Sequence, residues 1–221
     1  MRGYKRVIAL VLSVTLLAIL MAACGKQQGE VKNTDKVTGT GKPGTWSKAP
    51  EMSIDPSKSY QAIFDTNEGS FTIDLFAADA PGTVNNFVFL AKQHYYDGVT
   101  FHRIIQDFMI QSGDPTATGG GGPGYTIKDE LGGPHTYEPG IVAMAKTRSP
   151  DSAGSQFFIC TGGASQNLNQ TPDYPIFGKI SEGMDTVLKI AATPVTVDPA
   201  SGEVSKPEKT IIIKSIKIKE S

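Results

Sequence analysis

The sequence predicts a mainly β domain, a barrel or a sandwich of short strands that is capped by two α-helices. The first observation is a series of short apolar runs separated by Gly, Pro, Asn and Asp, which is typical of strands joined by tight turns. The second is that two other segments carry apolar residues at helical spacing. The third is composition, because 24 Gly and 14 Pro in 221 residues suit a globular, loop-rich chain.

The first elements of the domain follow from this pattern. The folded part is expected to begin near Tyr60, with two strands around a turn at Asn67–Gly69. The next segment, APGTVNNFVFLAKQHYY, has apolar residues at helical spacing behind Pro81, which suits the first turn of a helix. A second helix is predicted from EGMDTVLKIAA at 182–192.

The remaining strands are predicted from apolar runs further along the chain. The last of these runs alternates apolar and basic residues, which is typical of a strand with one buried face. The runs are VTFHRIIQDFMIQSGD at 99–114, GIVAMAK at 140–146, SQFFICT at 155–161, IFGKI at 176–180 and KTIIIKSIKIKES at 209–221.

The N-terminal residues have the pattern of a secretory signal. MRGYKR carries three basic residues and Val7–Ala23 carries no charge, so a basic region precedes an apolar one. The run LMAAC, which ends at Cys24, resembles the lipobox of bacterial lipoproteins, although Met21 stands where leucine is commoner. This resemblance implies cleavage before Cys24 and a diacylglyceryl group on its thiol. An uncleaved membrane helix is the alternative, but the apolar run is slightly shorter than the ~20 residues that a span needs.

Three parts of the chain are therefore predicted: a lipoprotein signal peptide at 1–23, a flexible tether at 24–58 and a folded domain at 59–221. A random coil of the tether's length has a reach of roughly 30–35 Å. Trp46 falls in the tether, and docking on the domain, contact with the membrane interface and an ordinary loop position remain open for it. The anchor on Cys24 predicts the extracytoplasmic face of the cell membrane, with a Gram-positive bacterium as the expected source.

The charged and titratable residues exclude several functions. The net charge is −1 and Lys and Arg form no run, so nucleic-acid binding is not expected. His94, His102 and His135 lack metal-ligand spacing, so no metal site is predicted. His102 next to Arg103 suggests a general base, but strand neighbours point to opposite faces, which favours a structural role for the histidine.

Two further features are assigned to structure rather than to chemistry. Cys160 has no disulfide partner if Cys24 is lipidated, and its apolar surroundings predict a small buried core residue. The run GGGGPG at Gly119–Gly124 lacks the Gly-Lys-Ser/Thr ending of a phosphate-binding loop. It is expected to form a tight surface loop that lets a ligand approach the backbone.

Arg103 is unusual because it lies within an apolar stretch, FHRIIQDFMIQSGD. Charged side chains avoid such surroundings unless they gain an interaction there. Either Arg103 points outward from a half-buried strand, or it faces an apolar cleft and donates hydrogen bonds to a ligand. On one strand Arg103, Met109 and Gln111 share a face, whereas Phe108 joins them only through a kink or bulge near Gln106–Asp107.

Several separated motifs of the sequence resemble those of one protein family. FHRIIQDFMIQSGDP followed by GSQFFICT resembles the cyclophilin family of peptidyl-prolyl cis-trans isomerases. The match extends from about Tyr60 to Ile218 and includes TVNNFVFLA, GGPGYTIKDE, GIVAMA and IFGKI in the same order. The whole chain resembles the lipid-anchored cyclophilins of bacteria. The resemblance implies a closed eight-stranded antiparallel β-barrel capped by two α-helices, with the active site in a groove on the outer surface.

The resemblance also implies a role for each matching position. Arg103 is the catalytic arginine, and Gln111 and Phe108 belong to the same catalytic group. Asn167 stands where cyclosporin-sensitive members carry a tryptophan that donates a hydrogen bond to the drug, so weak cyclosporin binding is expected. Tyr174 stands where many eukaryotic members have histidine, after a loop that is longer than theirs. The implied substrate-binding residues are Met109, Gly119, Ala145, Lys146, Gln156, Phe158, Leu168 and Tyr174.

The predicted function is therefore peptidyl-prolyl cis-trans isomerisation, a foldase activity on Xaa-Pro bonds of exported proteins. No cofactor is expected, because the reaction needs no proton transfer, covalent intermediate or metal, and the protein is expected to be a monomer. One alternative is a holdase or binding module at the cell surface that holds proline-containing segments without accelerating their exchange. A purely structural envelope protein is a further alternative, which the complete set of groove residues disfavours.

Overall fold

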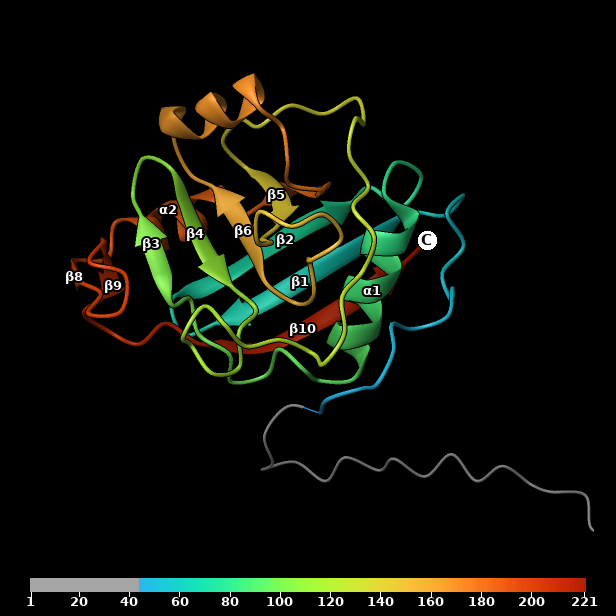
Figure 1. The fold of residues 1–221 in the computed structure, drawn as a ribbon, viewed down its shortest axis with the longest axis horizontal. Coiled ribbons are helices and arrows are strands. Elements are labelled where there is room, and N and C mark those ends of the chain that lie inside the picture. The colour runs from blue at the N-terminus through green and yellow to red at the C-terminus, as the bar shows by residue number, and fades with distance from the viewer. Residues whose placement is uncertain (1–43) are drawn as a thin grey trace, which may run out of the picture. The chain divides into compact units, whose positions relative to one another are not determined.

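The computed structural model describes residues 44–221, and the predicted signal peptide and Cys24 lie outside the described residues. In this part of the chain, eight strands form one antiparallel sheet in the order β10-β1-β2-β7-β5-β6-β4-β3 (Figure 1). Every predicted strand region contributes to this sheet, so the mainly β class is confirmed. The strands are β1 (Tyr60–Thr66), β2 (Gly69–Leu75), β3 (Arg103–Ile105), β4 (Met109–Ser112), β5 (Ile141–Met144), β6 (Phe157–Cys160), β7 (Ile176–Glu182) and β10 (Ile213–Glu220).

The sheet is curled but open, so the predicted closed barrel is wrong. β3 and β10 are its two edge strands. Among the described residues, one isolated bridge, Thr100↔Ile212, joins the segments that lead into these strands, and no continuous ladder closes the sheet. Within the sheet, β3 pairs with β4 alone. A small hairpin that was not predicted, β8 (Val195–Val197) and β9 (Val204–Pro207), lies beside it (Figure 1).

Both predicted helices are present. α1 (Pro81–Lys92) begins at the proline that the sequence placed in its first turn, and α2 is Met184–Ala191. Glu130 completes the start of α1, because its carboxylate accepts hydrogen bonds from the backbone N–H groups of Gly82 and Thr83 at 2.9 and 2.7 Å. Among residues 44–221, no helix combines the length and the apolar character needed to cross a membrane.

A third helical segment was missed. Gly163–Gln170 forms a 3-10 helix, η1, of eight residues. Its sequence, GASQNLNQ, contains a single large apolar side chain, so it has no helical periodicity to detect. This segment lies directly after β6 and before the loop that leads into β7, and it supplies Leu168 to the site described below.

The two faces of the sheet carry different apolar clusters. The main core lies on one face, where residues of α1 and α2 pack against the strands and where Phe157 is completely buried. A smaller cluster on the other face includes Met109, Phe158 and Tyr174. Because neighbouring strand residues point to opposite faces, β6 contributes Phe157 to the first cluster and Phe158 to the second. The candidate site lies on the second face.

Residues 103–112 form a hairpin rather than one long strand. β3 and β4 pair with each other, and the three residues from Gln106 to Phe108 form the turn between them. Phe108 N–H donates to Ile105 O at 2.9 Å, which closes this turn. The prediction that Arg103 and Gln111 share a face is confirmed, but the reason is their direct pairing across the hairpin. Phe108 lies in the turn, so its side chain does not follow the alternation of faces along a strand.

Trp46 docks on the folded domain. Its backbone N–H donates to Pro123 O at 2.8 Å, and its ring lies edge-on to Phe89 with 5.2 Å between the ring centroids. Gly124, with φ +93°, packs so closely that a Cβ there would lie 2.7 Å from Trp46 O. Of the three positions left open for the tryptophan, docking on the domain is the one observed.

Candidate active site

Arg103 belongs to a row of residues that crosses the sheet on its second face. Arg103 on β3 pairs with Gln111 on β4, and Gln111 pairs with Phe158 on β6. Phe158 in turn pairs with Ala143 on β5. Residues that pair directly in antiparallel strands have their side chains on the same face, about 4.5–5.5 Å apart. Strand pairing therefore brings the arginine, the glutamine and the aromatic ring together.

A cavity of about 250 Å³ lies over this row. Six of its nine lining residues have apolar or aromatic side chains, and the guanidinium of Arg103 and the amide of Gln111 are among the polar groups. The ring of Phe158 is edge-on to that of Tyr174, with 5.4 Å between the centroids. Such a cavity suits a small apolar ring that carries polar backbone groups. All of its lining residues were predicted as site residues, namely Arg103, Phe108, Met109, Gln111, Ala145, Lys146, Phe158, Leu168 and Tyr174.

The other two predicted residues, Gly119 and Gln156, line a neighbouring cavity of about 500 Å³. A chain of side-chain amides connects the two cavities. Gln111 Nε2 donates to Gln156 Oε1 at 2.9 Å, and Gln156 Nε2 donates to the carbonyls of Gly119 and Gly121 at 3.0 and 2.9 Å. Arg103 Nη1 lies 3.4 Å from Gln111 Oε1. The arginine is thus linked to the glycine loop (Gly119–Gly124) through two glutamines.

Asp114 holds the glycine loop beside this second cavity. The residue is 1% exposed, and its carboxylate accepts hydrogen bonds from the backbone N–H groups of Thr116, Thr118 and Gly121 at 2.7, 3.0 and 3.0 Å. The Thr116 hydroxyl donates a further bond at 2.7 Å. Burial opposes the charged form of Asp114, but these hydrogen bonds outweigh it, and the pKa of the carboxyl lies below its ordinary value.

Acid is expected to weaken this loop. Because the folded-state pKa of Asp114 is lowered, its charged form stabilises the fold above the unfolded pKa of about 3.9, and this stabilisation is lost as the pH falls through the folded pKa. Asp114→Asn should lower the free energy of unfolding by about 2 kcal/mol near pH 7. Below about pH 4 the difference from the wild type should shrink. Urea unfolding near pH 7 and near pH 3 measures both values, and an equal difference at the two pH values would contradict the assignment.

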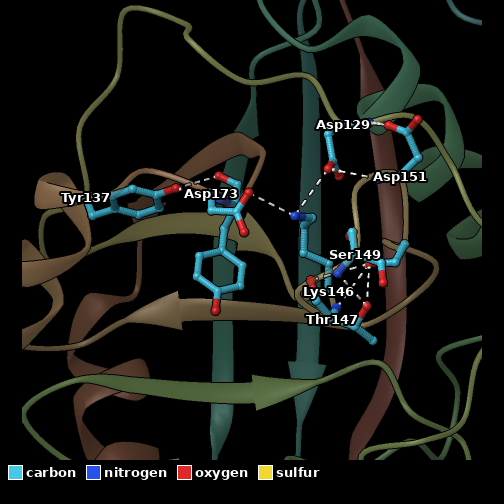
Figure 2. Close-up of polar contacts among 9 residues, drawn as sticks. Asp129, Tyr137, Lys146, Thr147, Ser149, Asp151 and Asp173 are labelled. Atoms are coloured by element: carbon cyan, nitrogen blue, oxygen red, sulfur yellow. Dashed lines mark hydrogen bonds and ion pairs between the residues drawn. The ribbon is translucent and has the colours of Figure 1, made fainter.

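The ammonium group of Lys146 lies between two carboxylates (Figure 2). Its Nζ is 3.2 Å from Asp129 Oδ2 and 3.0 Å from Asp173 Oδ1, and the side chain is 1% exposed. Burial alone would lower the pKa of Lys146, but the hydrogen bonds to Asp173 and Asp129 outweigh it and raise the pKa. The side chain therefore joins two loops that flank the site, and it is the backbone of Lys146 that remains for contact with a ligand.

Removing this ammonium group is expected to destabilise the domain. Lys146→Met should lower the free energy of unfolding by about 2 kcal/mol, between the values for exposed and fully buried ion pairs, because Asp173 is 53% exposed whereas Asp129 is 9% exposed. The matched control is Lys179→Met. Lys179 pairs with Glu138 at 2.7 Å, but both side chains are nearly half exposed, so the change should be within about 0.5 kcal/mol. Equal urea midpoints for the two variants would argue against the bridging role of Lys146.

Tyr137 supports the site and was not found from the sequence. Its hydroxyl donates to Tyr174 O at 2.7 Å and accepts from Tyr174 N–H at 3.0 Å. Asn169 in η1 holds the backbone of Tyr137, since its side chain accepts from Tyr137 N–H at 2.8 Å and donates to Tyr137 O at 2.9 Å. These bonds fix the segment that carries Tyr174. Tyr137 lies in an irregular loop, where no periodic pattern could have indicated it.

Glu203 is a second residue that the sequence did not indicate. Its carboxylate accepts two hydrogen bonds from Arg103, Nε to Oε2 at 2.6 Å and Nη2 to Oε1 at 2.8 Å. Glu203 lies directly before β9, one hundred positions after Arg103 in the chain. No local spacing can predict a contact over that sequence separation.

The reactive groups of His102 and Cys160 are buried. Both ring nitrogens of His102 are buried and lack a hydrogen-bond partner among residues 44–221, and burial lowers the pKa of the ring. Cys160 is completely buried, as predicted, and burial raises its pKa to about 11. Within the described residues, no three His, Cys, Asp or Glu side chains are grouped so that they could hold a metal ion.

Sequence comparisons relate the chain to known proteins. A family model described as cyclophilin type peptidyl-prolyl cis-trans isomerase/CLD matches residues 62–218. Peptidyl-prolyl cis-trans isomerase B of Bacillus subtilis is 46% identical over 127 residues, which are 57% of this chain and 85% of that protein. A putative peptidyl-prolyl cis-trans isomerase of Staphylococcus epidermidis is 38% identical over 188 residues, which are 72% of this chain and 92% of that protein.

Solved structures show the same relationship. The crystal structure of a cyclophilin type peptidyl-prolyl cis-trans isomerase from Cryptosporidium parvum is 34% identical with a TM-score of 0.65, and the match covers 74% of this chain and 99% of that chain. A structure of the same C. parvum protein in the presence of the dipeptide Ala-Pro has a TM-score of 0.64. The sequence and structure comparisons therefore agree with each other.

Proposed function

The chain belongs to the cyclophilin-type peptidyl-prolyl cis-trans isomerases, and from this premise we propose that Arg103 carries the reaction in the cavity between β3 and Tyr174. The protein is an isomerase of class EC 5.2.1.8. The observation that supports the proposal most directly is that the guanidinium of Arg103 and the apolar ring of Phe158 line the same small cavity.

The proposed role of Arg103 follows from the chemistry of the bond. Rotating an Xaa-Pro peptide bond must overcome about 18–20 kcal/mol, because amide resonance is lost on the way. In the twisted state the proline nitrogen regains its lone pair and can accept a hydrogen bond. A donor at that position stabilises the transition state more than the planar substrate, which is the condition for catalysis. Arg103 is suited to this task, because a guanidinium is always charged and presents several N–H donors.

The neighbouring residues have complementary roles in this proposal. Phe108, Met109, Phe158, Leu168 and Tyr174 surround the proline ring and exclude water, which strengthens a hydrogen bond to the ring nitrogen. The glutamine pair, Gln111 and Gln156, together with the backbone at Ala145, Lys146 and Gly119, holds the peptide on one side of the bond while the other side turns. These steps involve no proton transfer, no covalent intermediate, no metal and no cofactor.

The proposed substrates are Xaa-Pro segments of exported proteins. The structure of the C. parvum relative in the presence of the dipeptide Ala-Pro supports proline-containing peptides as ligands. The basic and apolar residues before Cys24 support export and a diacylglyceryl anchor on the extracytoplasmic face of a bacterial membrane. Exported chains emerge there unfolded, and a monomeric isomerase that needs no nucleotide suits such a place.

The activity test uses the full-length protein in detergent and a short Xaa-Pro peptide. We expect substoichiometric protein to accelerate cis/trans exchange of the peptide, measured by NMR exchange spectroscopy. If the peptide binds, as seen by calorimetry, but exchanges at the uncatalysed rate, the protein is instead a proline-binding module or holdase. That outcome would reject the proposed role of Arg103.

The lipid anchor has its own test. Expressed in a Gram-positive host, the mature protein is expected to begin at Cys24 with a diacylglyceryl group, a species that mass spectrometry identifies. Cys24→Ala should retain residues 1–23, because lipidation is needed before cleavage. A wild-type protein that retains residues 1–23 would instead favour the uncleaved membrane helix.

We propose weak cyclosporin binding on the basis of a single residue, Asn167. Asn167 is exposed on η1 next to Leu168, which lines the cavity. An asparagine side chain is too short to replace the hydrogen bond and the stacking area of an indole. Calorimetry with the purified protein tests this, and an affinity in the nanomolar range would contradict it.

A further inference from the structure

The side chain of Glu203 holds one edge of the Arg103 guanidinium. Nε–H donates to Oε2 at 2.6 Å and Nη2–H donates to Oε1 at 2.8 Å, so the pair is bidentate. We propose that Glu203 is a positioning residue of the isomerase reaction, which fixes the orientation in which Arg103 presents its remaining N–H donors to the substrate. This inference rests on the proposed function of Arg103.

The geometry leaves one side of the guanidinium available. Arg103 Nη1 lies 3.4 Å from Gln111 Oε1 and 3.5 Å from Met109 Sδ, and both of these residues line the proposed proline cavity. These contacts are long compared with the two bonds to Glu203, so they are weak. The two short bonds therefore face the β8–β9 hairpin, whereas the weakly engaged Nη1 group faces the cavity.

Glu203 is itself held by its hairpin. Its carbonyl accepts from Asp198 N–H at 2.7 Å, and its N–H donates to Ser201 Oγ at 3.3 Å. The hydrogen bond from Arg103 lowers the pKa of Glu203, and although burial opposes the shift, the carboxylate is ionised at neutral pH. The hairpin lies beside β3 (Figure 1), so it presents the carboxylate to the arginine from outside the sheet. A functional side chain held by a rigid neighbour is more effective than one that must be ordered during the reaction.

The expected effect is on the rate rather than on folding. The two side chains are 33% and 35% exposed, and ion pairs of such exposure contribute little to stability. A long arginine side chain without this contact samples many rotamers, and the entropy of ordering it is then lost in the transition state. The carboxylate also offsets part of the positive charge of Arg103. However, it binds the edge away from the cavity, where water screens it, so orientation should outweigh this loss.

The test uses full-length protein in detergent, with Glu203→Ala and Glu203→Gln. We expect Glu203→Ala to lower kcat about tenfold while KM changes less than about twofold, because a transition-state interaction is weakened and ground-state binding is not. Glu203→Gln keeps the size of the side chain and one oxygen that accepts a hydrogen bond from Arg103. Its kcat should therefore lie between those of the wild type and Glu203→Ala. The matched control is Glu208→Gln, an exposed carboxylate just after β9, which should behave as wild type.

Two further readouts separate positioning from a structural role. The Nε–H resonance of Arg103 should be protected from solvent exchange in the wild type and unprotected in Glu203→Ala. In an Arg103→Lys background, Glu203→Gln should cause no additional loss of kcat, because its effect passes through the guanidinium. A raised kcat in Glu203→Gln would mean that Glu203 restrains the arginine, and a raised KM at unchanged kcat would mean that the hairpin binds substrate. Either result overturns the proposal.

The failure of this inference can be told apart from the failure of the proposed function. If Arg103→Ala keeps the full wild-type rate, the role of Arg103 is wrong, and the role of Glu203 fails with it. If Arg103→Ala is inactive but Glu203→Ala retains wild-type kcat, only the role of Glu203 is wrong.

Discussion

Replacing Arg103 by alanine is expected to lower kcat/KM for an Xaa-Pro peptide by about 10²–10³-fold, the usual cost of removing one preorganised donor to developing charge. The loss should appear in kcat, because the planar substrate offers no lone pair on its proline nitrogen and so gains nothing from the arginine. NMR exchange of the peptide at several substrate concentrations measures kcat and KM separately.

Two further measurements distinguish a loss of catalysis in Arg103→Ala from a loss of folding. Arg103→Lys keeps the positive charge but replaces the planar guanidinium by a compact ammonium group, so an intermediate rate is expected. The ion pair with Glu203 that both variants alter is about one-third exposed, at 33% and 35%, so the free energy of unfolding should change by less than about 1 kcal/mol. A folded Arg103→Ala protein with wild-type kcat would sink the mechanism.

Truncation of the two neighbouring phenylalanines of β6 is expected to affect stability to different extents. Phe157 is completely buried, and its ring centroid lies 5.7–5.9 Å from those of Phe64, Phe87 and Tyr96. Phe157→Ala should therefore lower the free energy of unfolding by about 3–5 kcal/mol, a large part of the 5–15 kcal/mol that is typical of a domain. Phe158→Ala opens a cavity that water can already reach, so its loss should be smaller, about 1–3 kcal/mol.

The order of the two variants should be the opposite for substrate binding, with the larger change in KM for Phe158→Ala. Phe158→Ala removes most of one wall of the proposed proline cavity, so KM should rise about tenfold or more, whereas the fraction of Phe157→Ala that stays folded should keep the wild-type KM. Urea unfolding followed by circular dichroism gives the stabilities, and peptide exchange below the unfolding transition gives KM. Phe158→Leu is the conservative control and should lie close to the wild type. An unchanged KM in Phe158→Ala would mean that the substrate does not use this cavity.

Local pattern was sufficient for much of the fold, whereas the members of the site were assigned from the resemblance to the cyclophilin family. The helices at Pro81–Lys92 and Met184–Ala191 follow from apolar spacing, and the strands follow from short apolar runs. The position of Arg103 on the face of Gln111 was predicted from strand parity, but the correct reason is their pairing across a hairpin whose turn carries Phe108. Parity gave the right face here because the turn has three residues, so residues that pair across the hairpin are separated by an even number of positions.

Closure of the sheet could not be read from the sequence. Whether β3 meets β10 depends on how two strands from distant parts of the chain are placed, and in this sheet the two strands are opposite edges. Two groups of side-chain contacts could not be predicted for the same reason. They are the contact of Arg103 with Glu203 and the contacts of Lys146 with Asp129 and Asp173. Each contact involves a loop or a hairpin whose sequence has no periodic pattern. Each contact forms only because the folded sheet brings its partners together.

The docking of Trp46 gives the protein a built-in optical reporter. The chain has one tryptophan, so its emission spectrum reports on a single place, the contact with Phe89 and with the backbone at Pro123–Gly124. This place adjoins the glycine loop whose carbonyls hold Gln156. The emission of Trp46 should shift to the red when the segment that carries it leaves the domain. If this shift occurs at a lower urea concentration than the loss of far-ultraviolet circular dichroism, the segment detaches before the sheet unfolds. Because the chromophore is native, rearrangements of the loop during peptide binding can be followed by stopped flow without attaching a dye.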